Sequence, residues 1–250
     1  MMERLLERIS LSKYNRNFIL KGGFLIASIV GLDTRSTMDL DTTIKGIELT
    51  HNSILEIFKD ICKIEIEDDV TFFVNQAANI RESDDYPGIR VSLTADYPPL
   101  VIPIKIDVTT GDKITPREII YTYRLLFDNR SISILAYNLE TILAEKIETI
   151  LSRNIANTRP RDFYDVYTLF RLRGSECNHQ VLKVALEATA KKRGSLSLLF
   201  QYASIIETLQ SNTRMQSFWL NYQKEFEYAE KISFDDTCNT VLAIMKQLNF

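Results

Sequence analysis

Residues 35 to 43 read RSTMDLDTT and place two carboxylates, Asp39 and Asp41, in a segment whose composition is typical of a β-strand. Successive side chains of a strand point to opposite faces, so Thr37, Asp39 and Asp41 would share one face. Two negative charges on one face repel each other unless a cation lies between them, one is protonated, or both reach water. The pair therefore predicts either a cation site or a solvated strand edge.

A third carboxylate lies in a later segment, VIPIKIDVTT, whose alternation predicts another strand over residues 101–110. Ile104, Ile106 and Val108 fall on one face of it and Asp107 falls on the other. Carboxylates from two strands suit one or two Mg²⁺ ions, because hard cations take oxygen ligands and Mg²⁺ is commonly shared with substrate phosphates. In this interpretation the metal ligands are Asp39, Asp41 and Asp107.

Two glycines precede this region. Gly22 and Gly23 end a predicted strand and open a predicted helix. Backbone amides at such a junction suit an anion such as a nucleotide phosphate, although the glycines could also serve the turn alone. The order of Gly-Gly, helix, Arg35, Thr37 and the two aspartates favours the phosphate interpretation.

Lys146 falls within the apolar stripe of a helix predicted over residues 138–153. A lysine in that position needs a carboxylate or a phosphate, or its ammonium must reach the surface along its own stem. The next helix begins in TRPRDFYDVY and places Asp162 and Asp165 on one side. Asp162 in the first turn also complements the helix dipole, and Asp165 is interpreted as a structural hydrogen-bond partner.

The composition argues against several other kinds of site. With two His and three widely separated Cys, the sequence supports neither a His-dependent nucleophile nor a zinc site, and it suggests no disulfide framework. A net charge of −3 argues against a general nucleic-acid coat. The arginines between residues 153 and 173 could form a local basic surface or a solvated helix face. No apolar run approaches the roughly 18 residues of a membrane span, and we expect a cytoplasmic protein.

The periodicity changes along the chain. Strands are predicted at residues 17–23, 37–44, 70–80, 88–97 and 101–110, with helices at 1–11, 24–31 and 53–62. The strands at 70–80 and 88–97 read as an antiparallel pair joined by the turn ESDDYPG. Helical patterns follow at 138–153, 160–173 and 179–192 and continue to the C-terminus. We predict an α+β fold, with a mixed domain over residues 1–135 and a helical domain over residues 136–250.

Five segments resemble, in the same order, the motifs of the AbiEii/AbiGii-type nucleotidyltransferase toxins of the DNA polymerase β-like nucleotidyltransferase superfamily. These segments are FILKGG (18–23), RSTMDLD (35–41), PIKIDV (103–108), LAEKIETILSR (143–153) and RPRDFYDVY (159–167). The resemblance covers roughly residues 16–170, and the rest of the chain carries no matching motif.

The resemblance implies a nucleotidyltransferase-type mixed sheet flanked by helices and followed by a helical domain. It implies an NTP substrate, Mg²⁺ as cofactor, and nucleotide phosphates near Lys146. Asp39 and Asp41 would be metal ligands, and Asp107 a third carboxylate acting as base or metal ligand. The remaining site residues are Asp162 as the acid of the last motif, and Gly22, Gly23, Arg35 and Thr37 in the nucleotide-binding segments.

The family also implies an RNA acceptor, with the tRNA 3′ end leading, and growth arrest within a toxin–antitoxin or abortive-infection system against phage. A winged-helix antitoxin is the expected partner, although its action need not involve direct contact. Two alternatives remain open, namely transfer to a protein or small molecule and a catalytically silent nucleotide-binding module. A metal-dependent nuclease could use the same acids.

Overall fold

The computed structural model describes residues 1–35, 37, 39–80, 88–126 and 128–250. This part of the chain divides into two compact units. Unit 1 contains residues 1–29, 36–112 and 118–137, and unit 2 contains residues 30–35, 113–117 and 138–250. Two short segments, 30–35 and 113–117, thus belong with the later helices although their neighbours in sequence belong to unit 1.

Unit 1 is built on a mixed sheet that has seven strands over the described residues, in the order β3-β4-β5-β2-β1-β7-β6. The strands are β1 (Phe18–Lys21), β2 (Leu40–Ile44), β3 (Thr71–Ile80), β4 (Gly88–Tyr97), β5 (Leu100–Thr110), β6 (Ile119–Arg124) and β7 (Ser131–Ala136). The helices are α1 (Met2–Leu11), α2 (Gly22–Val30, its last residue counted with unit 2) and α3 (His51–Cys62). The predicted α+β class with a mixed sheet is confirmed.

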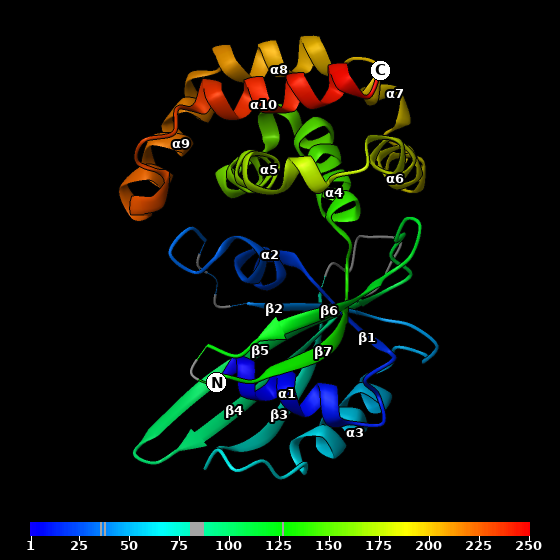
Figure 1. Ribbon diagram of the computed structural model, residues 1–250, viewed down its shortest axis with the longest axis vertical. Coiled ribbons are helices and arrows are strands. Elements are labelled where there is room, and N and C mark those ends of the chain that lie inside the picture. The colour runs from blue at the N-terminus through cyan, green and yellow to red at the C-terminus, as the bar shows by residue number, and fades with distance from the viewer. Residues whose placement is uncertain (36, 38, 81–87, 127) are drawn as a thin grey trace. The chain divides into compact units, whose positions relative to one another are not determined.

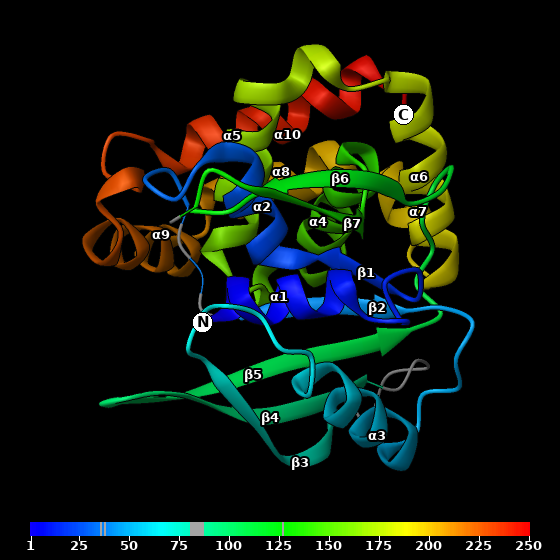
Figure 2. The same cartoon turned by 60° about the horizontal axis from the view of Figure 1, so that its bottom comes forward.

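The strand β2 is central to the arrangement of unit 1. It pairs antiparallel with β1 and parallel with β5, and β5 pairs antiparallel with β4. The predicted antiparallel pairing of β3 with β4 is confirmed, and Figure 2 shows both strands beside β5. Of the predicted turn ESDDYPG between them, all but its last glycine lies outside the described residues.

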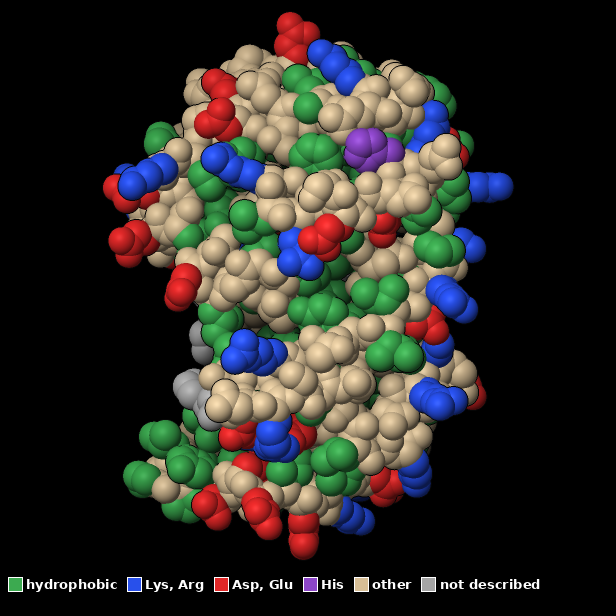
Figure 3. Space-filling model, in the orientation of Figure 1, with side chains coloured by type: hydrophobic (Ala, Val, Ile, Leu, Met, Phe, Trp, Pro, Cys, Tyr) green, Lys and Arg blue, Asp and Glu red, His purple; other side chains and the backbone are tan. Residues whose placement is uncertain are grey.

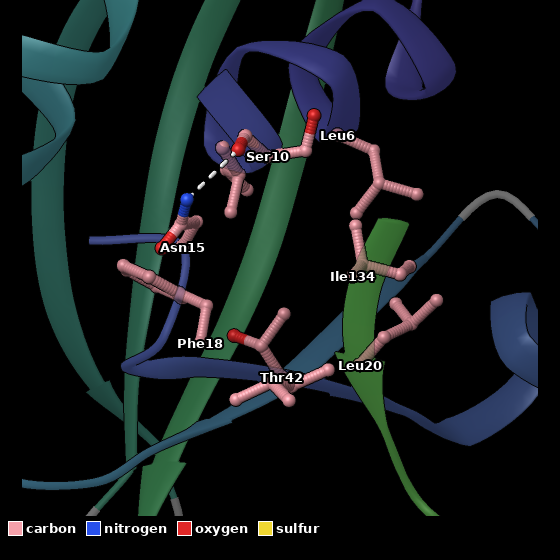
Figure 4. A pocket seen from close by; sticks show the side chains of 9 residues that line it. Leu6, Ser10, Asn15, Phe18, Leu20, Thr42 and Ile134 are labelled. Carbon is pink, nitrogen blue, oxygen red and sulfur yellow. Dashed lines mark hydrogen bonds between the residues drawn. The ribbon is translucent and has the colours of Figure 1, made fainter. Parts of the chain in front are cut away.

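Helices α1 and α3 lie on one side of the sheet and α2 on the other (Figure 1). The face beneath α1 is apolar because alternate strand residues, such as Leu20, Leu40 and Ile106, are buried. A cavity of about 10 Å³ lies there between α1 and Leu20, Thr42 and Ile134 (Figure 4). It has room for about one water molecule and not for a nucleotide.

Unit 2 is helical. Its helices are α4 (Leu139–Arg153), α5 (Pro160–Arg173), α6 (His179–Lys192), α7 (Leu196–Leu199), α8 (Tyr202–Ser211), α9 (Thr213–Glu225) and α10 (Phe234–Gln247). Side chains cap several of them, for example Asn138, which accepts from the Thr141 amide at the start of α4. Helix α10 packs against α5 and α8 (Figure 1). Over the described residues, none of the helices has the length and apolar character that crossing a membrane requires.

Several element boundaries differ from those predicted. The predicted strand 37–44 begins at Leu40, so Asp39 lies just before the strand and not within it. Strands β6 and β7 were not predicted, although IIYTYR and SISILA have the β-branched and alternating character of strands. The helix predicted to start at Ser53 begins at His51, because Thr50 and Ser53 form a capping box.

A buried ion pair fixes α1 to the segment before β3. Both Nη atoms of Arg8 donate to Asp68, at 2.7 and 2.9 Å, and both side chains are 3% exposed. Burial opposes ionisation of Asp68, but hydrogen bonds from Arg8 and from the Val70 amide outweigh it and lower the pKa of Asp68.

We expect Asp68→Ala to lower the free energy of unfolding by about 3 kcal/mol, because it leaves the Arg8 charge buried without its carboxylate. Urea denaturation followed by circular dichroism measures this loss. Glu67→Ala, at an exposed neighbour, is the matched control and should stay within about 0.5 kcal/mol of the parent. Equal stability of the two variants would contradict a structural role for the ion pair.

Candidate active site

A row of four charged residues crosses unit 1. Lys21 pairs with Asp41, Asp41 with Asp107, and Asp107 with Arg90, on strands β1, β2, β5 and β4. Directly paired residues project from the same face of a sheet. Their neighbours in sequence, such as Leu20 and Thr42, line the cavity under α1, so the charged row projects from the opposite face.

Gly22 holds the Asp41 carboxylate close to the start of α2. Gly22 has a φ of +68°, and a Cβ built on it would lie 2.1 Å from Oδ2 of Asp41. Only glycine therefore suits this position, both for its left-handed backbone and for the close approach of the carboxylate. The prediction that Gly22 ends a strand and opens a helix is confirmed.

Arg90 binds Asp107 through two parallel hydrogen bonds. Its Nε donates to Oδ1 at 2.7 Å and its Nη2 donates to Oδ2 at 2.8 Å. The hydrogen bonds to Asp107 raise the pKa of Arg90, and the charges of Asp107, Asp39 and Asp41 add to this rise although partial burial opposes it. The three predicted carboxylates therefore act together on one guanidinium.

The donor chemistry of this face fits a hard divalent cation, because carboxylate oxygens of Asp41 and Asp107 stand on adjacent strands and Asp39 is exposed one residue before β2. Within the described ranges, however, no three His, Cys, Asp or Glu side chains are grouped closely enough to hold a metal ion. The structure thus brings Asp41 and Asp107 together, but Asp107 contacts Arg90 and does not complete a set of three ligands.

Lys21 is paired in register with Asp41, and its ammonium also forms hydrogen bonds of its own. Its ammonium donates to Thr109, at 2.7 Å, and to Asp112, which also accepts from Tyr137. Burial opposes ionisation of Asp112, but the charge of Lys21 and these hydrogen bonds lower its pKa. Sequence patterns did not single out Lys21, Asp112 or Tyr137, which lie far apart in the chain.

Unit 2 contains a second cluster of charges, from α4, α5 and segment 30–35. Nζ of Lys146 lies 2.6 Å from Oδ1 of Asp162 and 2.8 Å from Oδ2 of Asp165. Arg35 donates from Nε to Oδ1 of Asp165 at 2.7 Å. Both aspartates are buried, so Lys146 forms ion pairs with buried carboxylates, and Asp165 accepts a hydrogen bond from Arg35.

This cluster keeps Lys146 charged. Burial opposes the charge, but the carboxylates of Asp162 and Asp165 outweigh it and raise the pKa of Lys146. Lys146 is therefore positively charged at neutral pH. Its side chain is 19% exposed, and Oδ2 of Asp162 is buried without a hydrogen-bond partner among the described residues.

The C-terminal helices, which carry no recognisable motif, support this second cluster. Tyr222 and Tyr228 pack against Tyr164 of α5, with ring centroids 5.8 and 4.9 Å away. The Tyr164 hydroxyl donates to the Thr34 carbonyl, directly before Arg35. Burial raises the pKa of Tyr222, which remains a neutral phenol beside the ion pair.

The predicted nucleotide-binding residues Arg35 and Thr37 differ in their exposure and in their hydrogen-bond partners. Arg35 is 4% exposed and committed to Asp165, so its contact with a nucleotide stays a prediction. Thr37 is half-buried, and its Oγ1 accepts from the Asp39 amide at 3.3 Å. Arg90 was not predicted as a site residue. The alternation of GIRVSL indicates which face of the strand Arg90 lies on, but not which residue it pairs with across the sheet.

The visible surface carries no broad field of one charge. On the face shown in Figure 3, Lys and Arg side chains are interspersed with Asp and Glu side chains. Any binding of polyanions on this face would therefore depend on local groups and not on a general basic surface.

Comparisons with known proteins agree with this architecture. Residues 4–239 match the family described as "Nucleotidyl transferase AbiEii toxin, Type IV TA system". A Helicobacter pylori structure with a provisional nucleotidyltransferase assignment shares 15% identity, with a TM-score of 0.51 over 98% of this chain and 94% of that one. The JHP933 structure, also from Helicobacter pylori, shares 14% identity, with a TM-score of 0.52 over 98% and 91% of the two chains. No protein with a curated description matches the sequence significantly.

We expect Gly22→Ala to destabilise the protein by about 3 kcal/mol, of which roughly 1 kcal/mol comes from the left-handed backbone and the rest from displacement of Asp41. Gly194→Ala is the control, because Gly194 has a φ of +69° and open space where its Cβ would lie. Thermal unfolding of both variants measures the difference. An equal loss in both would show that the Asp41 contact is unimportant.

We expect Asp165→Asn to lower the free energy of unfolding by about 3 to 5 kcal/mol at pH 7, because Arg35 and Lys146 lose a shared buried carboxylate. Despite burial, Lys146 and Arg35 lower the pKa of Asp165 in the folded state. The contribution of Asp165 to the free energy of unfolding is therefore complete above about pH 3.9, the pKa of an aspartate in the unfolded chain. It is lost as the pH falls through the lower pKa of Asp165 in the folded protein.

The difference between parent and Asp165→Asn should therefore shrink below about pH 4 in urea titrations at several pH values. Asp33→Asn, at an exposed position of unit 2, should leave the pH dependence unchanged. A difference that stays constant down to about pH 2 would argue against a charged Asp165 in the folded protein.

Proposed function

Because the chain belongs to the AbiEii nucleotidyltransferase toxin family of type IV toxin–antitoxin systems, we propose that it transfers a nucleoside monophosphate from an NTP to RNA. The proposed acceptor is the 3′ end of tRNA, and the proposed cofactor is Mg²⁺. The enzyme class follows from the family, whereas the acceptor and the cofactor are our proposals.

The observation that carries the proposal is the register of β2 and β5. It holds Asp41 and Asp107 side by side on one face, with Asp39 next to them in sequence. Neighbouring strands lie about 4.8 Å apart, so two carboxylates on one face of adjacent strands are close enough for like charges to matter. Such a repulsive pair is expected where a divalent cation is to be bound.

In the proposed reaction, the acceptor hydroxyl oxygen forms a bond to the α-phosphorus of the NTP, and the bond to the leaving pyrophosphate breaks. Asp39 and Asp41 would hold Mg²⁺, which when bound supplies charge neutralisation on the triphosphate. Asp107 would take the proton of the acceptor hydroxyl or serve as a further oxygen ligand. The Gly22 and Gly23 amides at the start of α2 would donate to phosphate oxygens.

Lys146 enters the proposal as a cation for the phosphates, on the strength of the family motif. Its permanent positive charge and partly exposed side chain support that role. Asp162 and Asp165 would then position the ammonium, and Arg35 would position Asp165. Arg35 is thus proposed as a positioning residue and not as a direct phosphate ligand.

A nucleotide added to the tRNA 3′ end would block aminoacylation, and growth arrest would follow from the loss of usable tRNA. The type IV toxin–antitoxin family implies an antitoxin partner. We propose a winged-helix antitoxin that counteracts the arrest, with or without direct contact.

We expect the purified protein to lengthen tRNA when incubated with Mg²⁺ and its preferred NTP, and Asp41→Asn to reduce this activity by about 100-fold or more. The assay incubates each α-labelled NTP with separated pools of total RNA and total protein, followed by mass analysis of the labelled product. Asp96→Asn, on β4 and away from the charged row, is the control and should remain active.

Label in the protein pool would replace the RNA acceptor with a protein side chain. Shortened RNA would indicate a nuclease. No incorporation with any pool, together with undiminished toxicity of Asp41→Asn on induction, would leave the silent nucleotide-binding module as the better account.

A further inference from the structure

Arg90 uses both oxygens of a carboxylate that the proposed reaction needs. The planar fork of its guanidinium matches Asp107 in two parallel hydrogen bonds, at 2.7 and 2.8 Å. A divalent cation bound through Asp107, or a proton accepted by it, requires at least one of these oxygens. Arg90 and the proposed chemistry therefore compete for the same group.

We propose that Arg90 is an internal counter-ion that occupies Asp107 in the resting protein and exchanges with a divalent cation. The inference rests on the proposed use of a divalent cation, but it concerns binding alone and needs neither NTP nor acceptor.

The exposure of the pair makes the exchange feasible. The Arg90 side chain is 41% exposed and that of Asp107 is 17% exposed. The guanidinium can therefore reach water when it leaves, although it gives up two charge-assisted hydrogen bonds. By contrast, Lys146 and Arg35 lie with buried carboxylates and cannot leave them without stranding a buried charge.

The other cations nearby do not take this role. Lys21 is held by Asp112 and Thr109. Lys105 projects from the same face two residues before Asp107, but it is exposed and forms no ion pair within the described part of the chain. Arg90 is the cation hydrogen-bonded to Asp107, and the charges of Asp39 and Asp41 also act on it.

The exchange would change the direction of the Asp107 carboxylate. With Arg90 in place, the Asp107 oxygens point to the guanidinium. Release of Arg90 would let Asp107 turn toward Asp41, its neighbour across the strands. In the resting protein Arg90 would offset part of the negative charge of this face, and only a sufficient concentration of divalent cation would displace it.

The test is Mn²⁺ binding to the full chain, measured by the loss of the free Mn²⁺ electron paramagnetic resonance signal, without nucleotide. We expect Arg90→Gln to bind Mn²⁺ about fivefold more tightly than the parent, because the competing guanidinium is gone. Arg90→Lys keeps the charge but loses the second hydrogen bond, so it should tighten binding by about twofold. Lys105→Gln removes a charge from the same face without touching Asp107 and is the matched control.

The combination with Asp107→Asn isolates the exchange. In that background Arg90→Gln should tighten Mn²⁺ binding no more than Lys105→Gln does. Thermal unfolding in a chelator confirms that each variant is folded. An Arg90→Gln effect equal to that of Lys105→Gln, or one that persists with Asp107→Asn, would overturn the exchange and leave only a general effect of charge.

Failure of the proposed function is distinguishable from failure of this inference. Tighter Mn²⁺ binding in Arg90→Gln supports the exchange even when no NTP is transferred to RNA. Conversely, an active nucleotidyltransferase whose Arg90 variants bind Mn²⁺ as the parent does would retain the proposed function and refute the exchange.

Discussion

The register between β2 and β5 is the constraint on which the candidate site depends. Those strands are parallel neighbours, and their opposite face is packed under α1 by residues such as Leu40 and Ile106. A shift of one residue would turn the buried side chains outward, so the apolar face fixes the position of Asp41 beside Asp107. The core of unit 1 thus stabilises a pair of like charges that would separate if the chain were less restrained.

Each unit contains neighbouring aspartates that are paired with cations, but the two groups differ in their exposure to solvent. In unit 2, Asp162 and Asp165 are buried and meet Lys146 and Arg35, which are held in place by packing and by a shared carboxylate. In unit 1, the carboxylates lie nearer to solvent, and the cation that meets Asp107 is an exposed arginine. Burial makes the first arrangement permanent, whereas exposure makes the second exchangeable.

The sequence was sufficient for much of the fold because apolar periodicity and caps are local. It identified Gly22 at the start of α2, the buried face of β5 and the helices α4, α5 and α6. It could not identify Arg90 or Asp112 as members of the charged clusters, since their partners follow from strand order and register. Asp39 was placed inside a strand because it alternates with Asp41 in the sequence, whereas the strand begins only at Leu40.

Asp107 is proposed to act either as a base or as a metal ligand. Both roles begin with the same step. Both oxygens of Asp107 accept hydrogen bonds from Arg90, so a proton or a cation must approach an oxygen that the guanidinium already contacts. In the proposed exchange Arg90 leaves first, and this step is the same whether Asp107 then acts as a base or as a metal ligand.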